Sequence, residues 1–162
     1  MNGLITIRYI KQDDNDALAL IVRNSLAEFN AAKPGTVFYD VTTDHLYEVF
    51  QKERSKYFVV EMENTIAGGA GIYPTPGLED DTCELVKMYL IKKARGRGIG
   101  KILLQKCIEE AMQQGYKKIY LESMPELKLA IPMYEKFGFT FLKGPKGNSG
   151  HTGCDVWMMK EL

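Results

Sequence analysis

Residues 85–101 read LVKMYLIKKARGRGIGK, and this stretch decides the fold. Its first half is mostly apolar, as in a buried strand, and an amphipathic helix is predicted to follow from Gly98. The first N–H groups of a helix have no partner within the helix, and the helix dipole makes that end partly positive. A strand, a glycine turn and a helix in this order therefore predict an anion site suited to a pyrophosphate. Basic side chains add charge to the turn at Arg95, Arg97 and Lys101.

Three known phosphate-binding motifs can be compared with the sequence of this turn. A Walker loop does not match, because the run from Gly96 to Lys101 is one residue short and Ile102 stands where the magnesium-binding hydroxyl would be. A dinucleotide fingerprint begins with Gly96 and Gly98, but lysine or leucine occupies its last glycine position, and no βαβ unit opens the chain. The third pattern, Arg-x-x-Gly-x-Gly, matches in full at Arg95, Gly98 and Gly100.

Hydrophobic periodicity outward from the turn predicts alternating strands and helices. The predicted strands are Leu4–Ile10, Tyr57–Met62, Ile66–Tyr73, Thr82–Ile91, Lys118–Glu122, Phe139–Leu142 and Cys154–Lys160, with a hairpin turn at residues 63–65. The predicted helices run from Asp13 or Asp14 to Phe29, from Thr42 or Thr43 to about Lys52, from Gly98 to Gln114 and from Glu126 to Phe137. We find no internal repeat and no linker, so residues 1–162 are predicted to form one α+β domain.

The Arg-x-x-Gly-x-Gly pattern resembles motif A of the GNAT superfamily of N-acetyltransferases. Residues 130–139, AIPMYEKFGF, are similar to the tyrosine-bearing helix of that family and the Gly-Phe that follows it. The order of predicted elements also resembles the GNAT order over most of the chain. The resemblance implies a three-layer GNAT fold, in which about four helices flank a mixed central sheet of about six to seven strands that is splayed at the coenzyme A site.

The resemblance further implies an acyltransferase that moves an acetyl group from acetyl-CoA directly to a primary amine, expected to belong to a small molecule or an amino acid. The pantetheine arm of the coenzyme would lie between the strands at 82–91 and 118–122, and a backbone N–H near Met88 or Tyr89 would polarise the thioester carbonyl. The family often has an asparagine where this chain has Leu127, so Ser123 is the expected replacement. The residues implied to bind the coenzyme are Met88, Tyr89, Leu90, Arg95, Gly96, Arg97, Gly98, Ile99, Gly100, Lys101 and Ser123.

Two residues are the catalytic candidates. Tyr134 matches the family's tyrosine beside the coenzyme sulfur and would protonate the leaving thiolate; the alternative is a core tyrosine. Glu84 is the candidate general base. Strand alternation places it on one face with Val86 and Met88, where burial would raise its pKa. The alternative is a charge at the exposed start of a strand, and His151 or a chain of waters could serve as the base instead.

The acceptor pocket of GNAT enzymes is built from two loops, which here correspond to residues 30–40 and 144–155. The predicted substrate-binding residues are Phe38 and Tyr39 in the first loop and His151 and Cys154 in the second. A solvent-exposed histidine and a small buried cysteine are the alternatives for the second pair. Whether the second loop is a lid is left open.

The composition excludes some classes of function. The chain has 162 residues, 45% of them hydrophobic, and 21 basic residues balance 21 acidic ones, which argues against nucleic-acid binding. Three widely spaced cysteines and two histidines predict reduced thiols and no metal site. No signal peptide or membrane span is predicted, so we expect a cytoplasmic protein; a homodimer stays open. The alternative functions are acetylation of a protein's lysine or N-terminus, and a coenzyme A-binding regulatory module without catalysis.

Overall fold

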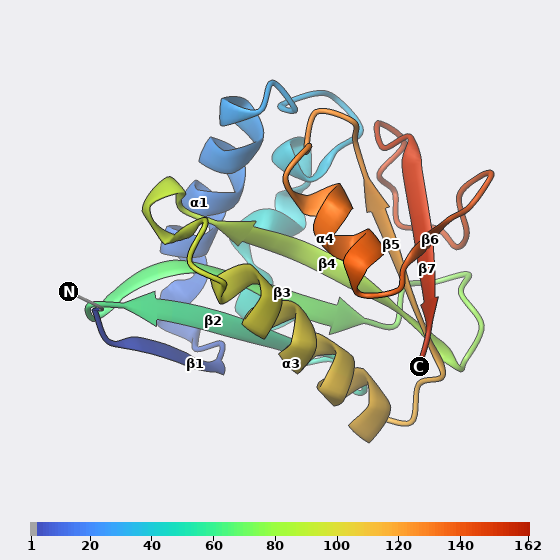
Figure 1. Cartoon of the computed structure of the whole chain (residues 1–162), viewed down its shortest axis with the longest axis horizontal. Coiled ribbons are helices and arrows are strands. Elements are labelled where there is room, and N and C mark those ends of the chain that lie inside the picture. The colour runs from blue at the N-terminus through green and yellow to red at the C-terminus, as the bar shows by residue number, and fades with distance from the viewer. Residues whose placement is uncertain (1–2) are drawn as a thin grey trace.

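A computed structural model describes residues 3–162, in which seven strands form one mixed sheet (Figure 1). The spatial order is β1-β2-β3-β4-β5-β7-β6, and β4 and β5 are the parallel pair in an otherwise antiparallel sheet. The strands are β1 (Ile5–Tyr9), β2 (Lys56–Met62), β3 (Thr65–Tyr73), β4 (Thr82–Leu90), β5 (Lys118–Ser123), β6 (Thr140–Phe141) and β7 (Val156–Glu161). This architecture confirms the predicted fold class.

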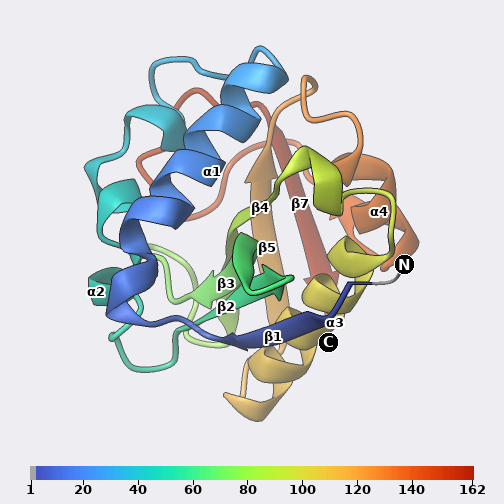
Figure 2. The same ribbon diagram turned by 90° about the vertical axis from the view of Figure 1, so that its left-hand side faces the viewer.

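Helices cover both faces of the sheet. Figure 2 shows α1 (Asn15–Glu28) and α2 (Leu46–Val49) on one face, with α3 (Ile99–Gln113) and α4 (Ala130–Lys136) on the other. The apolar stripe predicted for α3 is buried against the sheet at Ile99, Leu103, Cys107 and Ala111. Gly115 follows α3 with a φ of 85°, as a glycine just past a helix end should. None of the helices in the described part of the chain is long and apolar enough to cross a bilayer.

Two predicted helices are shorter than expected. The helix predicted from Thr42 or Thr43 to Lys52 is instead a 3₁₀ segment, Val41–Asp44, followed by the short α2. Asp40 caps that segment, since its carboxylate accepts a hydrogen bond from the backbone N–H of Thr42 at 2.9 Å, while the buried Thr43 hydroxyl donates to the Val37 carbonyl. The cap is therefore Asp40 and neither Thr42 nor Thr43, and His45, with φ −133° and ψ 42°, separates the two helical segments.

The helix α4 begins only at Ala130, four residues after the predicted start. Pro132 is its third residue, where the missing N–H would have had no partner within the helix anyway. Proline is tolerated in the first turn of a helix, so Pro132 fits a helix that begins at Ala130 and would not fit the interior of one that begins at Glu126. The last strands are also trimmed, to Thr140–Phe141 and Val156–Glu161.

A bulge in β4 changes which side chains share a face. Gly71 pairs with Val86 and Gly69 pairs with Tyr89, so β4 has one residue more than β3 between these points. Lys87 supplies it, with a φ of 51° in the left-handed region. Glu84 and Val86 consequently lie on the α1 face, where their neighbours belong to the α1 side of the core, whereas Met88 packs on the α3 and α4 side. The prediction that Glu84 and Met88 share a face is therefore wrong, because alternation does not anticipate the bulge.

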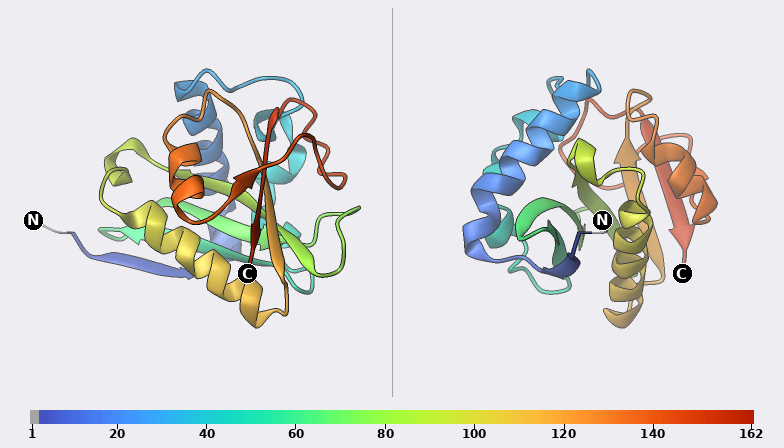
Figure 3. Two further views of the ribbon diagram at one scale, coloured as in Figure 1. Left: turned by 45° about the vertical axis from the view of Figure 1, so that its right-hand side comes forward. Right: turned by 60° about the vertical axis from the view of Figure 1, so that its left-hand side comes forward.

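The parallel strands β4 and β5 separate after a short stretch of pairing. Thr82–Glu84 pair with Lys118–Tyr120, and beyond these residues no pair joins the two strands within residues 3–162. Figure 1 and the left view of Figure 3 show the two strands diverging from a common end, with α4 lying over the opening. The sheet is therefore splayed at its centre, as predicted, and backbone groups of Met88 and Leu90 face the opening.

Candidate active site

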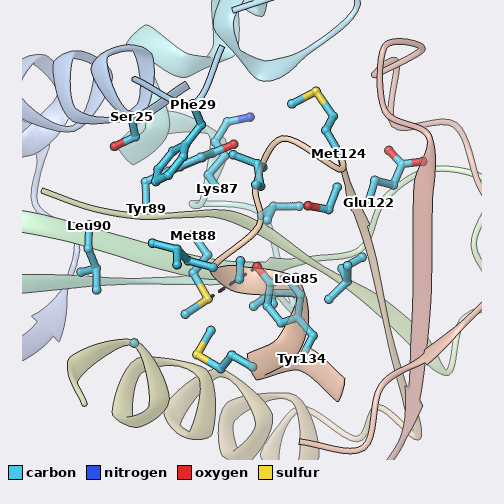
Figure 4. Close-up of a pocket in the computed structure, with 18 of the residues that line it drawn as sticks. Ser25, Phe29, Leu85, Lys87, Met88, Tyr89, Leu90, Glu122, Met124 and Tyr134 are labelled. Carbon is cyan, nitrogen blue, oxygen red and sulfur yellow. Dashed lines mark hydrogen bonds between the residues drawn. The ribbon is translucent and has the colours of Figure 1, made fainter. Parts of the chain in front are cut away.

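One pocket of about 470 Å³ passes through the opening between β4 and β5. Residues from both faces of the sheet line it: Ser25, Phe29 and Thr36 from the α1 side, and Ala130, Met133 and Tyr134 from the α4 side. At one end lie Gly98 and Lys101, and at the other lie Glu84 and His151. In Figure 4, Lys87 and Glu122 lie on the opposite side of β4 from Met88 and Tyr134. The pocket thus joins the predicted phosphate turn to the predicted acceptor loops.

The glycine turn is built as an anion site. Gly96 and Gly98 have φ angles of 73° and 79°, a conformation that L side chains rarely adopt. A Cβ at either position would meet no atom within 4 Å, so both glycines border open space, and no side chain caps α3. The bare N–H groups at the start of α3 therefore face the room that a diphosphate would need. Ile99 contributes through its backbone alone, because its side chain is buried in the core.

The three basic residues of the turn differ in what they contact. Arg95 lines the pocket, but its guanidinium pairs with Glu28 at 2.8 Å, donates to the Leu90 carbonyl and lies 4.8 Å from the ring centre of Phe29. Arg97 is exposed and contacts the Met62 sulfur at 3.9 Å, outside the pocket lining. Lys101 is exposed at the pocket rim. Lys101 is therefore the basic residue of the turn best placed to meet a phosphate, and Arg95 ties the turn to α1.

The side chain of Tyr134 lies against Met88 on the α4 side of the opening. Its hydroxyl is 4.0 Å from the Met88 sulfur, its side chain is almost entirely buried, and its ring packs edge-on against Phe139. Burial raises the pKa of Tyr134 above its ordinary value. The phenol therefore stays protonated at neutral pH, which suits a proton donor.

Glu84 is a buried carboxyl group at the other end of the pocket. Its side chain accepts a hydrogen bond from the Thr75 hydroxyl at 2.6 Å. Burial raises the pKa of Glu84 to about 7, the hydrogen bond from Thr75 opposes the shift, and the negative charge of Glu122 adds to it. A carboxyl group that titrates near neutral pH can take a proton from an amine and release it again.

Glu122 and His151 meet Glu84 at this end. One ligand atom from each of the three residues lies within 4.8 Å of the other two. The set of two carboxylates and an imidazole could hold a divalent cation or the ammonium group of a substrate. Glu122 also accepts hydrogen bonds from the hydroxyls of Tyr120 and Ser149, so it anchors the 144–155 loop.

A second group of charges lies beside this cluster. Asp40 contacts His151 Nε2 at 2.9 Å and Lys87 Nζ at 3.6 Å. The hydrogen bond from His151 is the main cause that holds the pKa of Asp40 below its usual range. Burial lowers the pKa of Lys87, whose side chain is only 6% exposed, and Asp40 opposes that shift. Asp40 thus links the bulge of β4 to the loop that carries His151.

The predicted acceptor residues are only partly at the pocket. His151 and Cys154 line it, whereas Phe38 and the exposed Tyr39 do not. Phe38 packs beside α1, and its carbonyl accepts a hydrogen bond from Arg23. Burial raises the pKa of Cys154 to about 12, which favours the thiol over the thiolate. The raised pKa therefore supports the alternative in which Cys154 is a small packing residue.

Sequence reasoning missed Glu122, Lys87 and Asp40. Glu122 could have been found from its place at the end of the strand beside Glu84, because Tyr120 pairs with Glu84 and Glu122 stands two residues further on. No signal in the sequence pointed to Lys87, whose side chain reaches the pocket through the bulge. Among the predicted coenzyme residues, Ser123 is buried and lines the pocket, and Leu127 lines it as an apolar residue.

Together these groups supply the parts of an acyl transfer to an amine. An oxyanion needs hydrogen-bond donors, a protonated amine needs a base, and a leaving thiolate needs an acid. The pocket offers the unpaired backbone of β4 at the opening, the carboxyl of Glu84 and the phenol of Tyr134. The base and the acid lie on opposite faces of the sheet with the opening between them.

Comparison with known proteins also indicates an acetyltransferase. A family model described as the acetyltransferase (GNAT) family matches residues 22–139. An uncharacterised N-acetyltransferase of Escherichia coli K12, YjgM, is 40% identical over 157 residues, which cover 96% of this chain and 94% of that protein.

Solved structures of low sequence identity share the fold. A GNAT-family acetyltransferase from Staphylococcus aureus Mu50 superposes with a TM-score of 0.86 at 20% identity, covering 98% of this chain and 99% of that one. The acetyltransferase yncA of Salmonella typhimurium, whose structure contains acetyl-CoA, has a TM-score of 0.75 at 21% identity, covering 99% of this chain and 95% of that one.

Proposed function

The chain belongs to the acetyltransferase (GNAT) family, and on this premise we propose that it transfers the acetyl group of acetyl-CoA to the primary amine of a small molecule or an amino acid. Members of the family are acyl-CoA-dependent N-acetyltransferases, and this chain is one of them. The observation that carries the proposal is the pocket through the β4–β5 opening, which begins at the glycine turn and ends at Glu84. We further propose that residues 1–162 act as one N-acetyltransferase domain, which the continuous seven-stranded sheet supports.

Acetyl-CoA supplies the acyl thioester. The N–H groups at the start of α3 and the ammonium of Lys101 would hold its diphosphate, because they surround the open space at Gly96 and Gly98. The free edge of β4 near Met88 and Leu90, with Ser123 opposite, would hold the pantetheine arm. A backbone N–H near Met88 would stabilise the oxyanion that forms on the thioester carbonyl.

Glu84 takes a proton from the incoming ammonium, and the neutral amine attacks the carbonyl carbon. The new C–N bond forms as the C–S bond breaks, and the phenol of Tyr134 gives its proton to the sulfur. The acylated nitrogen then gives up its surplus proton, which passes through water to the phenolate of Tyr134, and Glu84 releases its own proton to solvent. No enzyme group is acylated in this sequence, and the thiol of Cys154, with its raised pKa, takes no part.

We also propose that the reaction needs no metal ion and that the protein works in the cytoplasm. The general base, the acid and the oxyanion donor named above are all protein groups, and the free thiols at Cys83, Cys107 and Cys154 suit a reducing compartment. Activity is expected to be the same with and without EDTA.

A thiol-release assay with acetyl-CoA and a panel of primary amines tests the proposal. Release of coenzyme A that depends on the amine, with one acetylated product per thiol by mass spectrometry, would support it. Binding of coenzyme A without turnover of any amine in the panel would count against it.

A further inference from the structure

The acceptor end of the pocket has an excess of negative groups. The carboxyl groups of Glu84 and Glu122 line it together with the ammonium of Lys87, and the carboxyl group of Asp40 contacts Lys87 and His151 from outside the lining. The electrostatic neighbours of Glu84 in this region are Glu122, His151 and Lys87. With the three carboxyl groups ionised, their negative charges outnumber the single positive charge of Lys87.

The negative charge of Asp40 is already paired with other groups of the protein. It accepts a hydrogen bond from His151 Nε2 and forms an ion pair with Lys87, so it neutralises the one cation of this region. Because a carboxylate can only accept, Nε2 carries the hydrogen of this contact, and Nδ1 is the ring nitrogen that can accept a hydrogen bond when the ring is uncharged. The carboxylates of Glu84 and Glu122 have no cation of the protein within ion-pair distance in residues 3–162. Their charge is therefore available to a substrate.

The spacing of the Glu84, Glu122 and His151 atoms suits a primary ammonium group. Such a group has three N–H donors in tetrahedral directions, and acceptors at about 2.8 Å along them lie about 4.6 Å apart. The three ligand atoms of this cluster lie within 4.8 Å of one another. One ammonium can consequently reach all three residues, with Glu84 in place to receive the proton.

We propose that the acceptor is an alkylamine or diamine with no carboxylate near its reacting nitrogen, and that Glu122 is the positioning residue that selects it. This inference rests on the proposed function and narrows its substrate class. A carboxylate a few bonds from the nitrogen would enter beside Glu84 and Glu122, and like charges brought together in an interface repel one another. The ammonium of Lys87 offers little relief, since Asp40 already faces it. A second ammonium would instead gain from the remaining negative charge.

Three amines of equal chain length test the inference: propylamine, 3-aminopropanoate and 1,3-diaminopropane. The expected order of kcat/KM is diamine, then monoamine, then amino acid, with about 10-fold or more between first and last. The Glu122→Gln variant should reduce that ratio to about 3-fold or less, mainly by raising KM for the diamine. Glu109→Gln, on the exposed face of α3, is the matched control and should keep the wild-type order.

Two further variants separate charge from loop anchoring. Ser149→Ala removes the contact of the loop with Glu122 but leaves its charge, and it should preserve the order of the three amines. Glu122→Asp should restore most of the discrimination that Glu122→Gln loses. If Ser149→Ala abolished the discrimination as fully as Glu122→Gln does, Glu122 would act only as an anchor and the inference would be overturned.

The outcome is distinguishable from a failure of the proposed function. If 3-aminopropanoate were acetylated as well as the diamine, the enzyme would still be an amine acetyltransferase and the narrower inference would be wrong. If none of the three were acetylated, calorimetry with coenzyme A-loaded protein would still decide it. Tighter binding of the diamine than of 3-aminopropanoate, lost in Glu122→Gln, would support the inference, and equal or reversed affinities would overturn it.

Discussion

Burial and neighbouring charge set the chemistry of individual residues in this pocket. Glu84 is 3% exposed and keeps one hydrogen bond, from Thr75, so its ionised form is poorly solvated. Tyr134 is buried without a charged partner among its polar contacts, so its phenol is held in the protonated form. Removal from water thus raises the pKa of both side chains: it brings that of Glu84 close to neutral pH, where the carboxylate can act as a base, and it keeps the phenol of Tyr134 protonated.

The raised pKa of Glu84 predicts the pH dependence of catalysis. Glu84 must be ionised to accept a proton, and its pKa is about 7, so kcat/KM should fall about tenfold per pH unit below pH 7 and level off above it. Glu84→Gln should lower kcat/KM by about 100-fold and remove this limb of the profile. Thiol-release rates from pH 5.5 to 9 measure both, and an acidic limb that persists in Glu84→Gln would reject Glu84 as the base.

Removal of the Tyr134 hydroxyl should affect turnover more than binding. Tyr134→Phe keeps the ring against Phe139 and removes the proton donor, so kcat should drop by about 100-fold while the Kd for acetyl-CoA changes by less than about threefold. Stopped assays give kcat and calorimetry gives Kd. A variant with wild-type kcat would show that the tyrosine is only a packing residue.

At the residue scale, sequence patterns located the residues whose neighbours in the chain are distinctive. Tyr134 was found by its Gly-Phe context and Glu84 by its place early on β4, and both line the pocket. Lys87, Asp40 and Glu122 were not found, because their role depends on side chains that meet across three separate segments of chain. Phe38 and Tyr39 were expected at the pocket from their loop alone, and the orientation of that loop toward α1 was not predictable from its residue types.

At the scale of elements, the turn before α3 and the bulge in β4 determine the site. The turn needs glycine for two left-handed residues, and the bulge needs Lys87 in a conformation that costs a non-glycine residue free energy. The hydroxyl of the buried Tyr57 donates to the Lys87 carbonyl at 2.8 Å, which helps to hold the bulge. Gly69 and Gly71 on β3 leave room for the Tyr57 ring, since a Cβ at either position would come within 2.7 Å of one of its ring atoms.

Substitution of Gly98 tests the turn as a binding element. Gly98→Ala should strain the backbone by about 1–2 kcal/mol and place a methyl group in the open space at the start of α3, so KM for acetyl-CoA should rise about tenfold or more. Gly115→Ala is the matched control, because Gly115 has a similar φ of 85° and borders open space at the other end of the same helix.

The control should lower the melting temperature by a similar amount and leave KM unchanged. Steady-state kinetics and thermal melts of both variants provide the comparison. An equal KM for the two variants would show that the turn contributes only to stability.

Long periodic elements were predictable from the sequence, whereas local irregularities were not. The α3 stripe and the hairpin at Glu63 and Asn64, both with positive φ, follow from side-chain period and turn chemistry. The structure of the residues before α2 was not predictable in this way. It depends on the hydrogen bond from the Thr42 N–H to the Asp40 carboxylate and on the burial of the Thr43 hydroxyl. The alternation of side chains along a strand likewise does not predict the bulge at Lys87.

At the scale of the whole molecule, the opening between β4 and β5 interrupts the centre of the sheet. Each neighbouring pair of strands on either side of the opening is joined by hydrogen bonds. A ligand that bridges β4, β5 and the start of α3 would therefore add contacts where the sheet has none of its own.

Coenzyme A should accordingly stabilise the entire fold. At a concentration 100 times its Kd, a ligand that binds only the native state adds about 2.7 kcal/mol, which for a domain of this size raises the melting temperature by about 5–10 °C. Thermal melts with increasing coenzyme A measure the effect, and Gly98→Ala should need a higher concentration for the same increase. A melting temperature that does not respond to millimolar coenzyme A would contradict the placement of the site.

Because the bulge sends Glu84 and Met88 to opposite faces of the sheet, we expect the amine and the coenzyme to enter the pocket from opposite sides. Neither has to depart before the other arrives, and the spent thiol and the acetylated amine can each leave by the way its parent came in. Initial-rate plots at several fixed amine concentrations should thus give lines that intersect, and parallel lines are not expected. On this proposal, a single extra residue in one strand would shape the kinetic order of the enzyme.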